Sequence, residues 1–376
     1  MKIVIACGGT GGHLFPGVAV AERLLGRQHE VRLLVSEKAV EQTALTGLTA
    51  LAGASQWGVR SIKAVGFAGL SQLIPFCSQL AQSVRECAEL YAEFQPDVVL
   101  GMGGFTSAPA VLATRWPGGR PVAVIHESNA VPGKANRWAG KVADHVALGL
   151  PDCARFFRRK PVTVTGTPIR SRLSRGERVP DAAARLGLEA GKLTVAVMGG
   201  SQGAHAINEA IACALPWLDD WRARAQFVHL SGTADEAFVR EAYERNGMPA
   251  KVMGFCHEME LVYSVADVVI ARSGAATLTE IATFGVPAIL VPYPQAAGNH
   301  QWHNARAFER AGAAKLMEQS ALTTGMHAAR GERLAEAVND LLQDEARRTE
   351  MAQAARSLAH GDAAQRMVEL LEQCAK

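Results

Sequence analysis

The sequence contains few aromatic residues and no long apolar run, and each absence excludes a class of protein. Phe, Trp and Tyr together make up 6% of the 376 residues, whereas 36 residues are glycine. No apolar segment approaches the roughly 20 residues of a membrane-spanning helix, and residues 3–6 are too short for the core of a signal peptide. We therefore expect an α/β protein rich in tight turns, located in the cytosol or on a cytosolic membrane surface.

Cysteine usage and net charge indicate the cellular compartment and the class of binding partner. The seven cysteines are odd in number and never form a CxxC pair, which indicates ordinary buried thiols in a reducing compartment. A formal net charge of +3 is too small to favour nucleic acid as a partner. It still allows a local basic patch that meets phosphate or anionic lipid.

Common nucleotide-binding and metal-binding signatures are also missing. Gly8–His13 fits neither GxGxxG nor the GxxxxGK[ST] phosphate loop, so a nicotinamide or ATP cofactor loses its main support. Neither His126–Glu127 nor His257–Glu258 continues as HExxH, and no Asp-x-Asp occurs. We therefore expect no cofactor and no metal site.

The most informative pattern that is present, an apolar strand followed by a glycine turn and a helix, occurs twice. Residues 3–6 precede GGTGGH and a helical repeat of apolar side chains, with Pro16 expected in the first turn of the helix. Residues 193–215 repeat the pattern around GGSQGA. Such turns present backbone N–H groups and a helix dipole to an anion. Because 376 residues are more than a single hydrophobic core usually organises, we expect two similar α/β domains.

Further strands are predicted where short apolar runs end in polar or glycine-rich turns. These runs span residues 31–35, 97–100, 122–125, 142–148, 162–164, 227–230, 251–253, 268–270 and 288–291. Helices are predicted at residues 84–94, 332–342 and 346–374. Ligands of parallel sheets bind beyond the carboxyl ends of the strands, so the turns there mark the predicted sites.

Polar side chains in the first half are candidates for acid–base chemistry. His13 lies at a helix start, where it could serve as a general base or only bond within its own turn. His126–Asn129 ends a buried strand with four polar side chains, which indicates either a ligand site or a solvated strand end. The residues alone leave both choices open.

The second half carries a second set of candidate ligand contacts. In GGSQGA, Ser201 adds a hydroxyl donor to the backbone amides. Glu280, one to two turns into the helix that Arg272–Ala275 opens, could accept both hydroxyls of a ribose or only pair with the helix dipole. Gln301 and Asn304 lie beside histidines, and these amides favour hydrogen bonds to sugar hydroxyls over a metal.

Six motifs follow one another along nearly the whole chain: TGGH, GMGG with an aromatic residue, HExN, GGSQGA, RSGA with a later Glu, and HQ…NA. In this order they resemble the MurG family of peptidoglycan glycosyltransferases. The resemblance implies the GT-B fold, an α/β fold with two Rossmann-like parallel-sheet domains facing a central cleft. It also implies an inverting, metal-independent hexosyltransferase that moves N-acetylglucosamine (GlcNAc) from UDP-GlcNAc to the C4 hydroxyl of MurNAc in lipid I, giving lipid II.

The same resemblance assigns domains. Residues 1–163 would form the acceptor and membrane-facing domain, with a C-terminal helix at 358–376 packing back on it, and residues 164–357 would bind UDP-GlcNAc. His13, as the base, and Glu127 would be catalytic, and Gly103, Gly104, Phe105 and His126 would bind the acceptor. The donor contacts would be Thr10, Gly11, Gly12, His13, Asn129, Arg170, Ser201, Arg272, Ser273, Gly274, Ala275, Glu280, His300, Gln301 and Asn304.

Three positions depart from the family pattern. Phe105 stands where GMGGY is usual, Ser128 replaces the Gln of HEQN, and Thr167 replaces the Asn of GNPVR. Alternatives are a relative acting on a diacylglycerol acceptor, a UDP-GlcNAc epimerase of the same architecture, and a non-catalytic UDP-sugar sensor. An epimerase would form the 2-epimer without an acceptor, and a sensor would bind UDP-GlcNAc without turnover.

Because lipid I is held in a membrane, we expect a peripheral protein on the cytoplasmic face of the plasma (inner) membrane, in contact with anionic phospholipid. The resemblance also allows partners among cell-wall synthesis or division proteins. The membrane contact would comprise Arg60, Lys63, Phe67, Leu70, Leu73, Ile74, Phe76, Arg85, Arg115, Trp116, Arg120 and Arg158–Lys160. The alternative is that the apolar residues of this set belong to the core under a long loop.

Overall fold

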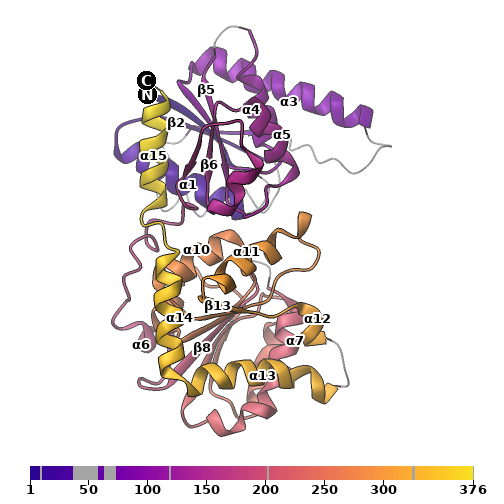
Figure 1. Ribbon diagram of the computed structural model, residues 1–376, viewed down its shortest axis with the longest axis vertical. Helices are drawn as coiled ribbons and strands as arrows, with labels where there is room; N and C mark the ends of the chain where they lie inside the picture. The colour runs from indigo at the N-terminus through magenta and orange to yellow at the C-terminus, as the bar shows by residue number, and fades with distance from the viewer. Residues whose placement is uncertain are drawn as a thin grey trace. The chain divides into compact units, whose positions relative to one another are not determined.

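The computed structural model describes residues 1–8, 11–36, 58–62, 73–117, 120–200, 203–323 and 327–375. It divides the chain into two α/β units, Met1–Ser171 with Asp362–Lys376, and Arg172–Gly361 (Figure 1). Each unit contains one parallel sheet covered by helices. None of the described helices is long and apolar enough to cross a membrane.

In the described part of the first unit, the sheet has the order β3-β2-β1-β4-β5-β6-β7. Its strands are β1 (Lys2–Ala6), β2 (Glu30–Ser36), β3 (Gly58–Ile62), β4 (Val98–Gly101), β5 (Val122–Glu127), β6 (His145–Leu148) and β7 (Val162–Val164). Its helices are α1 (Gly11–Gly26), α3 (Leu73–Phe94), α4 (Ser107–Ala113), α5 (Lys134–Val142), η2 (Pro151–Phe156) and α15 (Ala363–Cys374).

Both faces of the first sheet are buried at its central strands, because helices pack on each side. Ile3 and Ile5 of β1 lie in one apolar cluster with α1 and α15, whereas Val4 and Ala6 lie in another with α3 and α4. Alternate side chains of a strand point to opposite faces, which explains why the apolar run in β1 is continuous.

The described sheet of the second unit has the order β10-β9-β8-β11-β12-β13. Its strands are β8 (Leu193–Met198), β9 (Ala225–Leu230), β10 (Ala250–Met253), β11 (Val268–Ala271), β12 (Ala288–Leu290) and β13 (Ala314–Leu316). Its helices are α6 (Ala182–Leu186), α7 (His205–Ala214), η3 (Leu215–Trp221), α8 (Glu236–Arg245), α9 (Met259–Val265), α10 (Ala275–Phe284), η4 (Ala297–Asn299), α11 (His300–Arg310), α12 (Gln319–Thr323), α13 (His327–Gln343) and α14 (Glu345–Ser357).

The strand order reverses at the same place in both sheets, next to the first strand of each unit. β1 lies between β2 and β4, and β8 lies between β9 and β11. Parallel sheets bind ligands at the carboxyl edge where the order reverses. The turns after β1, β4, β8 and β11 are therefore the places to look for a site.

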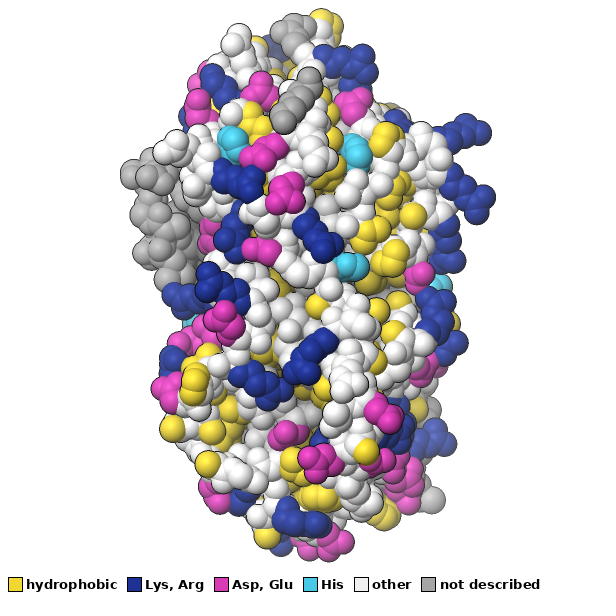
Figure 2. Space-filling view, turned by 60° about the vertical axis from the view of Figure 1, so that its left-hand side comes forward, with side chains coloured by type: hydrophobic (Ala, Val, Ile, Leu, Met, Phe, Trp, Pro, Cys, Tyr) yellow, Lys and Arg dark blue, Asp and Glu magenta, His cyan; other side chains and the backbone are white. Residues whose placement is uncertain are grey.

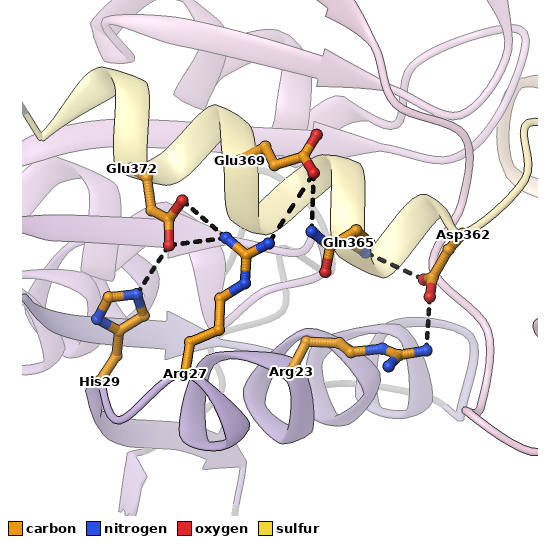
Figure 3. Close-up of polar contacts among 7 residues, drawn as sticks. All are labelled: Arg23, Arg27, His29, Asp362, Gln365, Glu369 and Glu372. Carbon is orange, nitrogen blue, oxygen red and sulfur yellow. Dashed lines mark hydrogen bonds and ion pairs between the residues drawn. The ribbon is translucent and has the colours of Figure 1, made fainter.

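The C-terminal helix α15 packs on α1 of the first unit, and charged side chains line the contact (Figure 3). Arg23 pairs with Asp362 at 2.5 Å, and Arg27 pairs with Glu372 at 2.8 Å. His29 lies 3.0 Å from the same carboxylate. The two termini lie side by side as a result (Figure 1).

Some element boundaries differ from those predicted. α1 begins at Gly11, so Pro16 lies in the second turn rather than the first, and its ring removes one internal helical hydrogen bond. The run 142–148 is not all strand, because α5 continues to Val142 and packs its apolar end into the same cluster as β6. The predicted helix 346–374 is broken after Ser357, where Gly361 adopts a positive φ of 64°.

The unit boundaries also lie later than predicted. The first unit continues past residue 163 to Ser171 because the N–H groups of Thr165 and Gly166 both donate to the Leu148 carbonyl of β6. Leu358 and Ala359 still donate to carbonyls of α14, which keeps them in the second unit.

Candidate functional site

His13, in the first turn of α1, is oriented by the turn that follows β4. Its Nδ1 lies 3.0 Å from the carbonyl oxygen of Met102. Because a carbonyl can only accept, a neutral imidazole here carries its proton on Nδ1 and its lone pair on Nε2. The bond comes from another element rather than from the histidine's own turn. The arrangement gives His13 the tautomer that a general base acting through Nε2 needs.

The turn after β4 needs glycine at two positions because other atoms, including the His13 ring, lie very close to its backbone. Gly103 has φ +102°, and a Cβ on it would lie 2.8 Å from imidazole atoms of His13. Gly104 has φ +75°, and a Cβ on it would lie 2.3 Å from the carbonyl oxygen of Gly8. These two residues were predicted to bind the acceptor. Their contacts in the structure explain why glycine is needed, and the acceptor role stays a prediction.

Glu127, at the end of β5, organises the loop that follows it. Its Oε1 accepts hydrogen bonds from the backbone and side-chain nitrogens of Asn129, both at 2.9 Å. Its Oε2 accepts from the Gly133 N–H at 3.0 Å and from Asn136 Nδ2 at 2.9 Å. The buried carboxylate thus has three donors from the loop that follows β5 and one from α5, an arrangement suited to holding the loop in place. The predicted catalytic role of Glu127 stays a prediction.

His126 is fully buried and has a partner on each ring nitrogen. Its Nε2 lies 3.0 Å from the Gly166 carbonyl, and Ser128 Oγ lies 3.3 Å from Nδ1. Burial lowers the pKa of His126 to about 4, so the ring is neutral at physiological pH. Because the ring is buried against the Gly166 carbonyl, we infer that His126 positions the Gly166 turn, and its predicted contact with the acceptor stays a prediction. Ser128, one of the departures from the family pattern, supplies part of that support.

Asn136, which the sequence analysis did not single out, joins this group from α5. Its Nδ2 donates to the His126 carbonyl at 3.0 Å as well as to Glu127. Its buried Oδ1 has no hydrogen-bond partner among the described residues. The spacing from Glu127 carries no motif, which explains why the pattern of residue types did not reveal it.

The glycine turn after β8 packs tightly against the neighbouring strand. Gly203 has φ +75°, and a Cβ there would lie 2.2 Å from the Ser231 carbonyl oxygen, just after β9. α7 begins at His205, so its first N–H groups face the end of this turn. Ser201, like Thr10 in the first unit, lies outside the described residues.

Glu280, in the second turn of α10, is held by a tyrosine of α9. The hydroxyl of Tyr263 donates to Glu280 Oε2 at 2.7 Å. Tyr263 is fully buried, whereas Glu280 is half-buried. Tyr263 is a second residue that sequence analysis missed, since its partner lies on another helix.

The predicted RSGA and HQ…N motifs form one hydrogen-bonded group. The Ser273 hydroxyl donates to the Gln301 carbonyl at 2.8 Å, and Asn304 Nδ2 donates to the Ser273 carbonyl at 3.1 Å. The Tyr293 N–H donates to Gln301 Oε1 at 2.9 Å. The structure therefore joins the start of α10 to the start of α11, as a shared ligand site would require.

Arg272, which directly precedes Ser273 of this group, is hydrogen-bonded to neighbouring turns. Its guanidinium donates to the carbonyls of Val291 and Pro292 at 3.2 and 3.1 Å, and to Gln319 Oε1 at 2.7 Å. Burial lowers its pKa from the usual value for arginine. We infer that Arg272 shapes the turn after β12, and a contact with uridine stays a prediction.

The remaining predicted residues lie as follows. His300, at the start of α11, bonds through Nδ1 to the Ala297 carbonyl at 2.8 Å. The guanidinium of Arg170 lies 5.5 Å from the centre of the Phe15 ring, within the first unit. Phe105 is 45% exposed. Gly11 and Gly12 begin α1, and Gly274 and Ala275 begin α10.

The described residues contain no group of three or more His, Cys, Asp or Glu side chains that could hold a metal.

Comparison with known proteins identifies the family. The profile described as Glycosyltransferase family 28 N-terminal domain matches residues 3–148, and that of the C-terminal domain matches residues 194–367. A relative from Geobacter sp. (strain M21) is 37% identical over 98% of this chain and 95% of its own. It is named UDP-N-acetylglucosamine--N-acetylmuramyl-(pentapeptide) pyrophosphoryl-undecaprenol N-acetylglucosamine transferase. The chain belongs to glycosyltransferase family 28.

Other relatives and solved structures agree with this family. A protein of the same name from Syntrophotalea carbinolica is 39% identical over 98% of both chains. The crystal structure of Acinetobacter baumannii MurG superposes with a TM-score of 0.77 at 29% identity, covering 99% of each chain. A UDP-N-acetylglucosamine 2-epimerase superposes with a TM-score of 0.69 at 14% identity, which shows a shared fold alone. Together with the two parallel sheets, these likenesses confirm the predicted GT-B fold and hexosyltransferase class.

Proposed function

We propose that this family 28 glycosyltransferase moves GlcNAc from UDP-GlcNAc to the C4 hydroxyl of MurNAc in lipid I, producing lipid II for peptidoglycan synthesis. The observation that carries the proposal is the 37–39% identity, over nearly the full chain, to transferases named for this reaction. Both halves of the family pattern are present in one chain. The proposal therefore includes a donor site and an acceptor site.

The second unit binds UDP-GlcNAc. The start of α7, which follows the GGSQGA turn, offers backbone N–H groups to the diphosphate. Glu280 accepts hydrogen bonds from the hydroxyls of the ribose. Gln301, whose backbone carbonyl is bonded to the Ser273 hydroxyl, forms a hydrogen bond with a sugar hydroxyl through its side-chain amide. The leaving UDP gains negative charge during transfer, and helix N-termini with backbone donors stabilise that charge.

The first unit activates the acceptor. His13 Nε2 takes the proton of the MurNAc C4 hydroxyl while the oxygen attacks the anomeric carbon from the side opposite UDP. The new C–O bond forms as the bond to UDP breaks, which inverts the anomeric centre through an oxocarbenium-like state. Glu127 holds the loop after β5 against the start of α5 through its four hydrogen bonds.

A direct test uses labelled UDP-GlcNAc and lipid I with the purified chain. We expect labelled lipid II, and we expect His13→Ala to lower transfer by roughly 10²-fold or more while UDP-GlcNAc affinity stays nearly unchanged, because only the base is lost. Near-normal transfer by His13→Ala would remove the base assignment. Formation of a 2-epimer without lipid I, or binding without turnover, would overturn the proposed reaction.

We also propose that the first unit contacts the cytoplasmic face of the inner membrane, with anionic phospholipid as the partner. Ile74, at the start of α3, is 83% exposed, which disagrees with the alternative that it is core. Trp138 on α5 is 68% exposed with the Lys141 ammonium 4.1 Å from its ring, and Arg155 lies 5.0 Å from the exposed ring of Phe156. We also propose cell-wall synthesis or division proteins as partners.

The structure changes which cations suit this contact. Arg115 pairs with Asp144 at 2.6 Å, and Lys160 Nζ donates to the Ala143 carbonyl at 2.7 Å, so both are used within the unit. Hydrophobic side chains lie beside Lys and Arg on the part of the surface that the first unit forms (Figure 2). Exposed rings rimmed by cations favour a reversible interfacial contact. Phe67, Leu70 and Lys63 lie outside the described residues, as does the side chain of Leu73.

Sedimentation with anionic vesicles tests this contact. Trp138→Glu should lower the bound fraction several-fold, because it places a negative charge at the headgroup level. Trp217→Glu is the matched control, since Trp217 is 52% exposed on the second unit. Both variants should still bind UDP-GlcNAc. Equal sedimentation of the Trp138 variant and the wild type would show that this ring does not meet the membrane.

A further inference from the structure

The hydroxyl of Tyr263 is fixed in space by the packing of its ring. Tyr263 is fully buried, and its ring stacks on Phe284 of α10 with centroids 5.3 Å apart and an angle of 25° between the ring planes. The hydroxyl is 2.7 Å from Glu280 Oε2. A phenol carries one proton, so Tyr263 donates and the carboxylate accepts. The orientation of the Glu280 side chain thus depends on a residue that cannot move without disturbing α9 and α10.

The same hydroxyl places Glu280 beside the glycine turn. It lies 3.6 Å from the Met198 sulfur. Met198 is the last residue of β8 and directly precedes Gly199. The carboxylate therefore lies at the carboxyl end of the strand whose following turn is proposed to bind the diphosphate. In a nucleoside diphosphate, the ribose is the group next to the phosphates.

We propose that Tyr263 is a positioning residue that makes Glu280 selective for the cis-diol of a ribose. The torsion that rotates a carboxylate is broad, so an unrestrained glutamate samples many orientations. The Tyr263 bond to Oε2 restricts this rotation and presents the carboxylate in one orientation to the 2′ and 3′ hydroxyls. This inference rests on the proposed binding of UDP-GlcNAc by the second unit, and it names which part of the nucleotide depends on Tyr263.

Calorimetry on the full chain with UDP and with 2′,3′-dideoxy-UDP tests the inference. The wild type should prefer UDP by at least about tenfold, as expected for charge-assisted hydrogen bonds to the diol. Tyr263→Phe should lower UDP affinity by about tenfold and leave the affinity for 2′,3′-dideoxy-UDP within about twofold. The preference for ribose should therefore nearly disappear. In a Glu280→Gln background, Tyr263→Phe should have no further effect on UDP binding.

Tyr243→Phe is the matched control. Tyr243 is another buried tyrosine of the second unit, and its hydroxyl lies 3.2 Å from His229 Nδ1. This variant loses the same atom from the same unit and should keep the wild-type preference for UDP. A second variant, Glu280→Asp, withdraws the carboxylate from an unchanged Tyr263 and should also lose the preference. Thermal unfolding of each variant shows whether it is folded.

Three outcomes would overturn the inference: an equal loss of affinity for both ligands in Tyr263→Phe, no change for UDP in that variant, or the same effect in Tyr243→Phe. If the wild type binds UDP with the expected preference but does not glycosylate lipid I, the proposed acceptor reaction fails while the inference on Tyr263 stands. If the wild type binds neither ligand, both the donor site and the role of Tyr263 are wrong.

Discussion

His13 and Gly103 form a pair in which the glycine keeps room for the histidine. Gly103→Ala would place a Cβ 2.8 Å from the imidazole and force a residue with a side chain to adopt φ +102°. We expect this variant to lower transfer nearly as much as His13→Ala does, because the ring must move away from the Met102 carbonyl. Steady-state assays with lipid I measure the effect, and UDP-GlcNAc affinity should not change.

Gly26→Ala provides the control for this variant, since Gly26 ends α1 and a Cβ there has no neighbour within 4 Å. It should be fully active. If Gly103→Ala were as active as the control, His13 would not depend on the turn after β4.

Residue types and spacing predicted some members of the site and missed others for a physical reason. His13 and Glu280 follow glycine turns at helix starts, a local signal that the sequence carries. Tyr263 and Asn136 act through hydrogen bonds to other elements, at Glu280 and at Glu127. Such contacts depend on tertiary packing, so no local pattern indicates them. The full burial of His126 also has no local signal in the sequence, because it depends on contact with Gly166, which lies 40 residues later in the chain.

At the scale of elements, strands that are apolar runs were predictable, whereas strands with polar or exposed residues were not. The central strands β1, β4, β8 and β11 are continuous apolar runs, since helices cover both faces. Of the four strands at sheet ends, β7 and β10 were predicted and β3 and β13 were missed. β3 exposes its middle residues, and β13 has Lys315 at its centre, so neither forms an apolar run.

The contact of α15 with α1 allows apolar packing to be compared with surface ion pairs. Leu371 is fully buried there, whereas the Arg27 and Glu372 side chains of the ion pair remain about a third exposed. We expect Leu371→Ala to lower the free energy of unfolding of the first unit by about 2–5 kcal/mol. Arg27→Ala should cost at most about 1 kcal/mol, because water screens exposed pairs. Chemical denaturation of both variants measures the difference, and a larger effect of Arg27→Ala would show that charge holds this helix.

At the scale of the whole molecule, both units bury a neutral histidine. Burial lowers the pKa of His126 in the first unit to about 4 and that of His229 in the second unit to about 3. In an unfolded chain both imidazoles return to an ordinary pKa of about 6.5. The unfolded state therefore binds more protons than the folded state once the pH falls below that value, and folding loses stability in acid.

This imbalance predicts how stability depends on pH. Below about pH 6.5, each histidine should lower the free energy of unfolding by about 1.4 kcal/mol per pH unit, until the pH reaches its folded pKa. The exposed His205 has the opposite effect on stability, because a hydrogen bond to Asp235 raises its pKa in the folded state. Its contribution to the free energy of unfolding therefore changes above about pH 6.5, not below it. Denaturation at pH 7, 6 and 5 should show the loss, and ring resonances should show that neither buried histidine titrates over that range. A flat stability from pH 7 to 5, or buried rings that titrate near 6.5, would contradict the linkage.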